Sequence, residues 1–263
     1  MRTNPAKPPQ RANAADDREY VAGLEKGLSV IEAFARRQSA LTVTEASELA
    51  GISRAAARRC LRTLQRLGYA DCDGKYYRLS PGVLRLGHAY VSSNSLPRFV
   101  QPIIETVSER TQRSMSVAVL DRGEVLVIAR AHVRRSLESG LGIGSRLPAY
   151  CSANGRVLLS ALADAEISRL LKATPLRRLT ARTKVQPQDV LKEIRAVRSR
   201  GYATNEQEVE VGVRTIAVPI CDRSGTVVAS LSLSAPVGDA ARDALIKLLP
   251  ELQAARSRIE SAL

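Results

Sequence analysis

Tryptophan is absent from the sequence, and aromatic residues make up only 3% of its 263 residues. Its buried cores must therefore be built mainly from leucine, isoleucine, valine and alanine. Cysteine is also scarce: Cys60, Cys72, Cys151 and Cys221 lie far apart, without the paired spacing of a zinc site or a disulfide framework. The sequence therefore predicts reduced thiols, no structural metal and a cytoplasmic protein.

Acidic residues are too few to balance the basic ones. Lysine and arginine number 40 against 26 aspartates and glutamates, which gives a formal charge of +14. Such an excess attracts polyanions, and we expect nucleic acid rather than a membrane as the partner. No uninterrupted apolar run is long enough to cross a bilayer. Residues 1–20 lack the apolar stretch of a secretory signal and predict a disordered arm that contains proline.

Residues 21–80 show the pattern of a small DNA-binding domain. Apolar residues recur at helical spacing from Leu24 to Ala35, and a second helix is predicted over residues 42–50 with Thr44 as its N-cap. Ser53 is expected to cap a third helix that runs to about Leu67. A hairpin with an Asp-Gly turn follows over residues 69–79. The order helix, helix, turn, helix, hairpin is typical of a winged helix-turn-helix.

The third helix carries a basic face. Arg54, Arg58, Arg62 and Arg66 follow one another at intervals of four and share one side of the helix. Arginine binds guanine edges and phosphates, so the first half of this helix is expected to enter the major groove. A basic solvated helix is the alternative, but the helix-helix-hairpin context favours DNA. The predicted DNA contacts are Thr44, Ser53, Arg54, Ala55, Ala56, Arg58, Arg59, Arg62, Lys75 and Arg78.

The remainder of the chain predicts a connecting helix and an α+β domain. The helix covers residues 81–96, and its apolar stripe, with Leu84, Leu86 and Tyr90, is expected to pack on a partner subunit. Residues 97–263 predict an antiparallel sheet with flanking helices. The expected hairpins span 114–120 with 125–130, and 215–221 with 226–234, while the expected helices span 99–111, 153–163, 164–171, 188–200 and 239–262.

Three features of this second domain suggest catalysis, and each has a simpler interpretation. The glycine-rich segment Gly140–Ser145 resembles a phosphate-binding loop, but Arg146-Leu147-Pro148 follows in place of a helix, so a flexible turn is favoured. Cys151 lacks a histidine in any Cys/His signature. The carboxylates of Glu206, Glu208 and Glu210 alternate as if on one side of a strand, yet no histidine supports a metal site. No catalytic residue, metal or cofactor is predicted.

Several motifs together resemble the IclR family of bacterial regulators. In the first half they are GLEKGLSVIEAF, LTVTEASELAGISRAAARRCLRTLQRLGYA and YRLSPGVLRLGHAYVSS. In the second half GIGSRLPAYCSANGRVLLSAL and GYATNEQEVEVGVRTIAVPICDRSGTVVASLSLSAP resemble the branch that controls the catabolism of aromatic acids. The resemblance, over about residues 24–263, implies a GAF-like effector domain and an effector related to protocatechuate, p-hydroxybenzoate or β-ketoadipate.

The resemblance also implies which residues line the effector pocket. A carboxylic acid needs a cation, hydroxyl or amide partners, and apolar walls for its ring. Arg130 and Arg134 flank the region and are expected to clamp the carboxylate. Ser232 and Ser234 alternate with leucines, so their hydroxyls point to one face of a strand. The other predicted pocket residues are Ala149, Tyr150, Ser152, Asn154, Gly155, Glu206 and Thr215.

These observations favour a ligand-responsive transcription regulator that binds a palindromic operator as a dimer or a dimer of dimers. Its predicted partners are double-stranded DNA and a small aromatic or dicarboxylic acid, with RNA polymerase as a further candidate. Two other hypotheses stay open. One is an enzyme with an accessory DNA-binding domain, which turnover of a ligand would reveal. The other is an architectural DNA-binding protein without a ligand.

Overall fold

The computed structural model describes residues 19–37, 40–132, 141–238 and 242–263. The chain divides into two compact units, Met1–Ser93 and Asn94–Leu263. All but the last two residues of the predicted N-terminal arm lie outside the described residues, and so does Arg134.

The first unit has the predicted order of elements. Val30, Phe34, Leu61 and Tyr77 meet in its core, which holds the three helices against the hairpin. The hairpin strands pair antiparallel, with Ala70 opposite Leu79. The elements are α1 (Ala22–Ala35), α2 (Val43–Ala50), α3 (Arg54–Arg66), β1 (Ala70–Cys72) and β2 (Tyr77–Leu79). The winged helix-turn-helix prediction is therefore confirmed.

The N-cap of α2 differs from the prediction. Thr42, and not Thr44, occupies the cap: its hydroxyl accepts from the backbone N–H of Glu45, and the Glu45 carboxylate accepts from the backbone N–H of Thr42. This reciprocal capping box satisfies two backbone N–H groups at the helix start. It therefore favours Thr42 over Thr44 as the N-cap. Gly51, at φ +66°, ends α2 in the left-handed conformation.

The connecting segment is two short elements and not one helix over 81–96. A 3-10 turn, η1 (Pro81–Val83), precedes α4 (Leu84–Ser93). No residue of α4 is buried, and Leu84 is 75% exposed, with Leu86 and Tyr90 also exposed. The apolar stripe predicted from the sequence is thus exposed in the single chain, and its packing on a partner subunit stays a prediction.

The second unit is built on one antiparallel sheet with the strand order β5-β4-β3-β8-β7-β6. Both predicted hairpins are present, as β3 with β4 and as β7 with β8. The edge strands β5 and β6 were not predicted, because each is too short to show an alternating pattern. The strands are β3 (Ser114–Asp121), β4 (Glu124–Ala131), β5 (Arg146–Pro148), β6 (Ala203–Glu206), β7 (Val213–Cys221) and β8 (Val227–Pro236).

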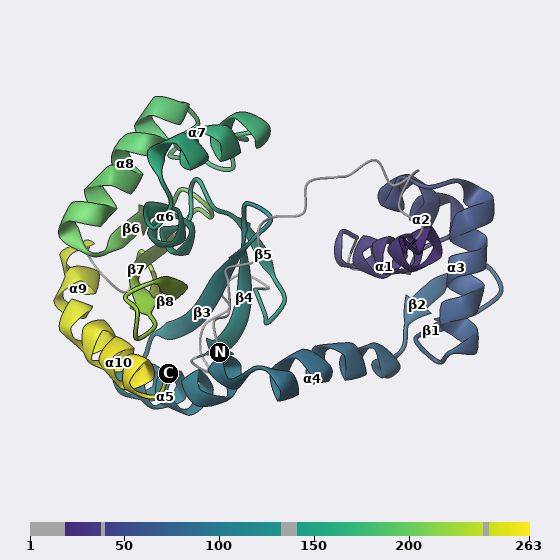
Figure 1. Cartoon of the computed structure of the whole chain (residues 1–263), viewed down its shortest axis with the longest axis horizontal. Helices are drawn as coiled ribbons and strands as arrows, with labels where there is room; N and C mark the ends of the chain where they lie inside the picture. The colour runs from purple at the N-terminus through teal and green to yellow at the C-terminus, as the bar shows by residue number, and fades with distance from the viewer. Residues whose placement is uncertain (1–18, 38–39, 133–140, 239–241) are drawn as a thin grey trace. The chain divides into compact units, whose positions relative to one another are not determined.

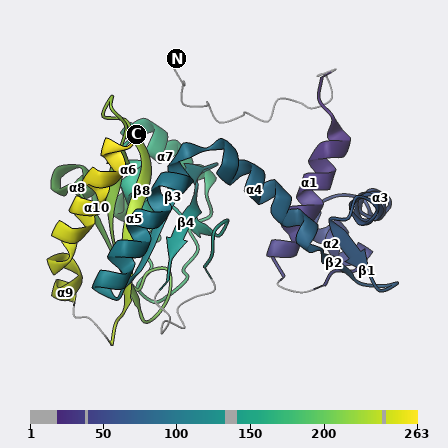
Figure 2. The same ribbon diagram turned by 90° about the horizontal axis from the view of Figure 1, so that it is seen from below.

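Helices cover both faces of this sheet (Figures 1 and 2). The long helices α5 and α10 lie on one face, over a core that includes Val117, Ile216 and Leu231. On the other face α6 contacts β3, β6, β7 and β8, and α8 packs against α6. The helices are α5 (Ser95–Thr111), α6 (Ala153–Ser160), α7 (Asp164–Ala173), α8 (Pro187–Arg200), α9 (Arg242–Lys247) and α10 (Leu249–Ser261).

Two helices differ from their predicted bounds because of proline. The segment predicted as one terminal helix breaks at Leu248, and Pro250 lies in the first turn of α10, where its missing N–H costs no hydrogen bond. Helix α5 begins at Ser95 and continues through Pro97 and Pro102. Pro102 removes an internal hydrogen bond, but the helix persists because its apolar face is buried in the core.

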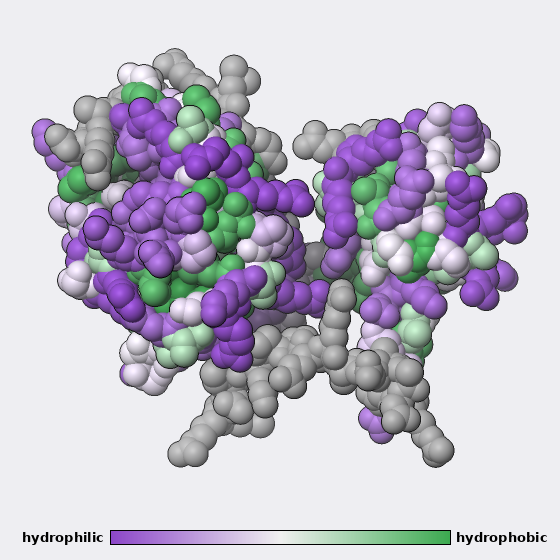
Figure 3. Space-filling view, turned by 90° about the horizontal axis from the view of Figure 1, so that it is seen from above, coloured by the Kyte–Doolittle hydropathy of each residue, from purple (hydrophilic) through white to green (hydrophobic). Residues whose placement is uncertain are grey.

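Hydrophilic side chains predominate on the face of each unit seen in Figure 3, and hydrophobic residues form smaller groups between them. Within the described ranges, no helix combines the length and the apolar character needed to cross a membrane.

Candidate functional sites

Helix α3 presents its basic face to solvent. Arg54, Arg58, Arg59 and Arg62 are all exposed, and Ala55 is exposed beside them. Ser53 caps the helix, since its hydroxyl accepts from the backbone N–H of Ala56 at 3.3 Å. No acidic residue lies in the first turn of the helix, so its N-terminal end keeps a positive potential that suits an approaching polyanion.

The structure corrects the role predicted for Ala56. Its side chain is only 5% exposed and packs inward with Ala57, Leu61 and Leu64, so it has no access to a base edge. Leu67, the C-cap residue of α3, is 58% exposed. Ala56 thus belongs to the buried face of α3, and Ala55 is the small residue left on its outer surface.

A wide groove runs between the start of α2, helix α3 and the hairpin. Three cationic side chains, Arg58, Arg62 and Lys75, line it together with Thr44, and no acidic residue is among the described residues of its lining. A groove with this charge and these hydroxyls suits a phosphodiester backbone. The remaining lining residues are Thr42, Val43, Gln65, Cys72, Gly74 and Tyr77.

The turn of the hairpin is held by Asp73. Its carboxylate accepts from the backbone N–H groups of Lys75 and Tyr76 and lies 3.1 Å from the Arg78 guanidinium. These hydrogen bonds and the cation lower the pKa of Asp73. Lys75 and Arg78 are exposed. For Arg78 to contact DNA, its guanidinium must bind Asp73 and DNA together or break its ion pair with Asp73.

A second candidate site lies in the other unit, where polar side chains form two rows across an otherwise apolar sheet. Register places Arg130 of β4 opposite Ser116 of β3, which is in turn opposite Ser232 of β8. The next row joins Ser234, Thr215 and Asn205 across β8, β7 and β6. Alternation along the strands directs all of these to one face of the sheet, the face that α6 covers.

Hydrogen bonds connect the members of each row. The hydroxyls of Ser116 and Ser232 lie 2.8 Å apart, and those of Thr215 and Ser234 lie 3.0 Å apart. The Asn154 amide, on α6, donates to the Ser116 hydroxyl at 3.5 Å. In each hydroxyl pair either oxygen can be the donor, so the rows can offer both donors and acceptors to a bound molecule.

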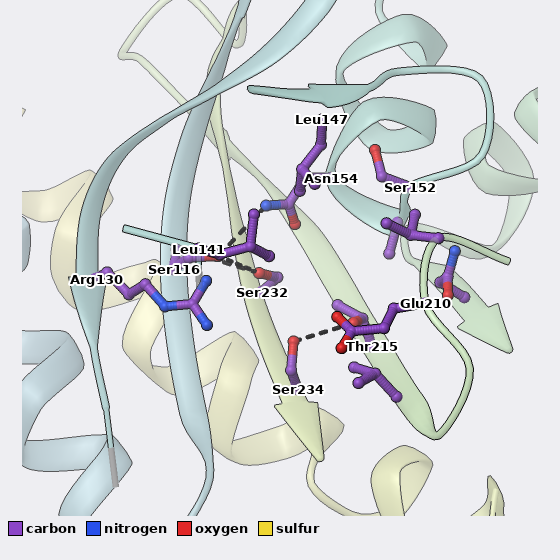
Figure 4. Close-up of a pocket in the computed structure, with 14 residues that line it drawn as sticks. Ser116, Arg130, Leu141, Leu147, Ser152, Asn154, Glu210, Thr215, Ser232 and Ser234 are labelled. Carbon is purple, nitrogen blue, oxygen red and sulfur yellow. Dashed lines mark hydrogen bonds between the residues drawn. The ribbon is translucent and has the colours of Figure 1, made fainter. Parts of the chain in front are cut away.

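These rows form the floor of a pocket (Figure 4). Its cavity volume is about 50 Å³, and the space between its walls continues into open solvent. Ser152, Ala153 and Asn154 at the start of α6 line one side, where free helical N–H groups favour an anion. Leu141, Leu147, Val209 and Val213 supply apolar walls, and Glu210 completes the lining.

Six of the predicted effector residues meet in this pocket, namely Arg130, Ser152, Asn154, Thr215, Ser232 and Ser234. Four do not line it: Ala149, Tyr150, Gly155 and Glu206. Arg130 also donates through Nε to the ring of His132 at 3.0 Å.

Each of the four displaced residues has a structural role. The Tyr150 hydroxyl donates to the backbone oxygen of Arg177, and burial raises its pKa to about 12. A Cβ on Gly155 would lie 2.2 Å from the Ala149 oxygen, so glycine is needed for α6 to pack on that backbone. Glu206 is held by Arg214 at 2.7 Å; burial opposes ionisation, but Arg214 prevails and lowers its pKa.

The three glutamates predicted to share one side of a strand lie in different environments. Strand β6 ends at Glu206, so Glu208 and Glu210 belong to the following loop. Glu210 lines the pocket, whereas Glu208 is buried against Arg156 of α6. Among the described residues, no cluster of three or more His, Cys, Asp or Glu side chains is placed to hold a metal.

The Arg156–Glu208 pair is the most deeply buried ion pair described. The two guanidinium Nη atoms lie 2.6 and 2.7 Å from the two carboxylate oxygens, and the side chains are 1% and 6% exposed. Arg156 also donates to the Tyr150 carbonyl, and Glu208 accepts from the backbone N–H of Lys184. The pair therefore joins α6 to the loop that carries Glu210.

The segment considered as a phosphate loop is a turn between strands. Its described part, Leu141–Ser145, is held by the bond from the Gly142 N–H to the Ser145 hydroxyl, and β5 follows it directly. No helix begins there, so the segment lacks the helix N-terminus that a phosphate loop needs.

Cys151 is fully buried, and burial raises its pKa to about 12. A thiol in this state is a poor nucleophile. We predict that iodoacetamide at pH 8 alkylates Cys60 and Cys72, which are partly exposed, but leaves Cys151 unmodified in the native chain. Peptide mass spectrometry would measure this, with urea-unfolded protein as the positive control. Modification of native Cys151 at the rate of Cys60 would contradict its burial.

Ser116, Asn205 and Glu210 also line the pocket, although the sequence did not predict them there. A signal was present for Ser116, since Ser114 and Ser116 alternate with Met115 and Val117 as Ser232 and Ser234 alternate with leucines. Asn205 and Glu210 gave no comparable signal, because their positions depend on how β6 and its following loop fold over the sheet.

Comparisons with known proteins match both units to the same family. A model of the IclR helix-turn-helix domain matches residues 23–74, and a model of the C-terminal domain of bacterial IclR transcriptional regulators matches residues 88–261. The Pca regulon regulatory protein of Pseudomonas putida is 42% identical over 95% of this chain and 87% of its own length.

Two further proteins extend the comparison. The p-hydroxybenzoate hydroxylase transcriptional activator of Acinetobacter baylyi is 39% identical over 81% of each chain. A solved structure of a transcriptional regulator from Rhodococcus sp. RHA1 is 38% identical, with a TM-score of 0.80, covering 92% of this chain and 98% of that chain. This chain therefore belongs to the IclR family of DNA-binding bacterial transcription regulators.

Proposed function

We propose that this regulator controls genes for the catabolism of aromatic compounds and that its pocket binds an aromatic acid or a ring-cleavage product. It binds a palindromic operator as a dimer or a dimer of dimers, in the cytoplasm where that DNA lies. Contact with RNA polymerase would follow if it activates transcription. Regulation rather than catalysis is proposed because Cys151, the nucleophile considered in the sequence, is buried with a raised pKa.

The observation that carries this proposal is the composition of the pocket. Arg130 and the N-terminal end of α6 supply positive potential for a carboxylate, the serine and threonine rows supply hydroxyl partners, and apolar side chains supply walls for a ring or chain. Two relatives support the same class of ligand: one is a regulatory protein of the Pca regulon, and one is a transcriptional activator for p-hydroxybenzoate hydroxylase.

The ligand acts on DNA binding only through a difference in affinity. It must bind one arrangement of the DNA-binding units more tightly than another, and the ratio of the two affinities limits the shift in operator affinity. The loop of Glu210, tied to α6 by the Arg156–Glu208 pair, connects the pocket to the body of the second unit.

Fluorescence anisotropy of DNA from upstream of the gene tests the proposal. The full chain would be titrated at several salt concentrations, with and without protocatechuate, p-hydroxybenzoate and β-ketoadipate. We expect specific binding with a steep salt dependence that one of these compounds alters. Specific binding unaffected by all three would contradict the ligand class. Equal affinity for random DNA would contradict the operator and favour an architectural role.

We predict different effects for two arginines of α3. Arg58→Ala should cost about 1–3 kcal/mol of operator binding and relax the base preference at one position, because the first half of α3 enters the major groove. Arg62→Ala should weaken binding to all sequences alike and reduce the salt slope by about one. Binding to a library of operator variants would measure both, with Arg110→Ala, in the second unit, as the control. Unchanged base preference in Arg58→Ala would contradict the assigned orientation of α3.

A further inference from the structure

One segment of the second unit is strongly basic. Between Glu166 and Asp189 the chain has six cationic residues and no acidic one. The Arg182 guanidinium lies 3.2 Å from the Glu206 carboxylate, whereas no acidic side chain among the described residues pairs with Arg177. The exposed cations of this segment are Arg169, Lys172, Arg177, Arg178 and Arg182. They form a positive surface that belongs neither to the pocket nor to the basic face of α3.

Most of these cations lie on the loop of residues 174–186, here called the basic loop. It connects α7 to α8, which pack against each other (Figure 1). Thr183 is buried at its centre, and the Thr183 hydroxyl accepts from the backbone N–H groups of Leu179 and Thr180 at 3.1 and 2.8 Å. The basic loop is therefore held in one shape by a buried side chain, although it contains no helix or strand.

The basic loop is joined to a second loop, residues 207–212. The Thr183 hydroxyl donates to the Glu208 carbonyl and the Thr180 hydroxyl donates to the Gln207 carbonyl, each at 2.7 Å. The Glu208 carboxylate is fixed in turn by its buried ion pair with α6. Because these bonds already order both loops, a partner that binds them loses little of its affinity to the cost of ordering them.

Each of the two loops exposes an apolar side chain. Leu179 is 44% exposed in the basic loop, and Val211 is 74% exposed in the other. Protein–protein interfaces combine apolar residues with arginine and contain little lysine, whereas protein–DNA interfaces are more polar. All of the exposed cations except Lys172 are arginines. The surface therefore fits a protein better than a nucleic acid.

Charge indicates the kind of protein that this surface fits. An acidic surface with an apolar centre would complement arginines that surround Leu179 and Val211. A second copy of this chain is a poor complement, because each copy has a formal charge of +14.

We propose that Arg177, Leu179 and Val211 belong to a docking surface for an acidic region of RNA polymerase. This rests on the proposed function, which includes contact with RNA polymerase, and it assigns that contact to the two joined loops of the second unit.

Binding of the full chain to purified RNA polymerase holoenzyme of the same bacterium tests the proposal, by biolayer interferometry at several salt concentrations. The native chain should bind, and its affinity should fall as salt rises, because salt screens the complementary charges. Arg177→Glu should weaken binding by roughly tenfold or more, since it opposes an acidic partner with an anion. Leu179→Ser should weaken it by roughly fivefold, through the loss of apolar surface.

The matched control is Arg223→Glu, which makes the same change of charge at an exposed position between β7 and β8. Its affinity for the polymerase should stay within about twofold of the native value, because charges far from the interface are screened. Circular dichroism establishes that the variants fold. Operator affinity, by fluorescence anisotropy, should be the same in all of them, which separates this surface from the proposed function.

Equal weakening by Arg177→Glu and Arg223→Glu would overturn the proposal, because net charge alone would then explain the binding. A native chain that binds its operator but not the polymerase would overturn the docking surface and leave the proposed regulator intact. Weaker operator binding by Arg177→Glu, with native affinity for the polymerase, would assign the surface to DNA. A smaller assembly of Leu179→Ser in sedimentation, again with native affinity for the polymerase, would assign it to a second copy of the chain.

Discussion

In the Glu208→Gln variant, the free energy of unfolding of the second unit should be about 3–5 kcal/mol lower than in the native chain. Glutamine keeps the shape of the side chain but leaves the guanidinium of Arg156 buried at 1% exposure without its counter-charge. Such a charge must either stay unpaired or draw water into the core, and both outcomes lower the free energy of unfolding. The same change also weakens the attachment of the Glu210 loop to α6.

Hydrogen-exchange mass spectrometry on the full chain would measure this effect, because it separates the two units. Exchange in β7 and β8 should accelerate by more than a hundredfold, whereas exchange in α3 should stay as in the native chain. The matched control is Glu251→Gln, which breaks the exposed pair with Arg110 and should cost less than about 1 kcal/mol. Equal effects of the two variants would contradict the structural role of the buried pair.

Replacing both partners provides a further check. The double variant Arg156→Met with Glu208→Gln removes the buried charge altogether, so it should lose less stability than the sum of the two single variants. Additive losses would mean that the two side chains contribute independently, against their bidentate contact.

Arg130→Gln should weaken binding of the acid effector by about 2 kcal/mol or more, roughly thirtyfold, because a carboxylate in a largely enclosed pocket loses its cation. Operator binding without ligand should not change, since Arg130 belongs to the second unit and the basic face of α3 belongs to the first. The variant should therefore bind DNA normally and respond only at much higher ligand concentration.

Calorimetry with the effector, together with anisotropy on the operator, would measure the two effects separately. Arg110→Gln is the control, because Arg110 belongs to α5, which covers the opposite face of the sheet, and pairs with Glu251. Native ligand affinity in Arg130→Gln would remove Arg130 from recognition of the carboxylate and assign the anion to the start of α6.

Local sequence signals predicted most of the architecture. Helical spacing located α1 and α3, Ser53 marked the start of α3, and the alternation of serine with leucine located β8. The errors arose where a distant or reciprocal contact decides the outcome. Thr42 caps α2 because Glu45 returns a second bond, and α5 continues through Pro102 because its apolar face is buried.

The pocket was predictable only in part, for a physical reason. Residues on long strands have directions fixed by alternation, which indicated Ser232 and Ser234, whereas Thr215 was indicated by the family resemblance. Glu208 and Glu210 follow the end of β6, where alternation stops, and their directions depend on tertiary contacts. Arg156 appears in the sequence as an ordinary helix cation, and its burial follows from the loop that brings Glu208 to it.

A small acid bound in the second unit is expected to change the affinity of the first unit for DNA. The most direct measurement is the affinity of the effector for the full chain, by calorimetry, first free and then saturated with operator DNA. Linkage requires that DNA change the effector affinity by the same factor by which effector changes the DNA affinity. We expect a matching change of roughly fivefold or more. Identical effector affinities in the two titrations would contradict it.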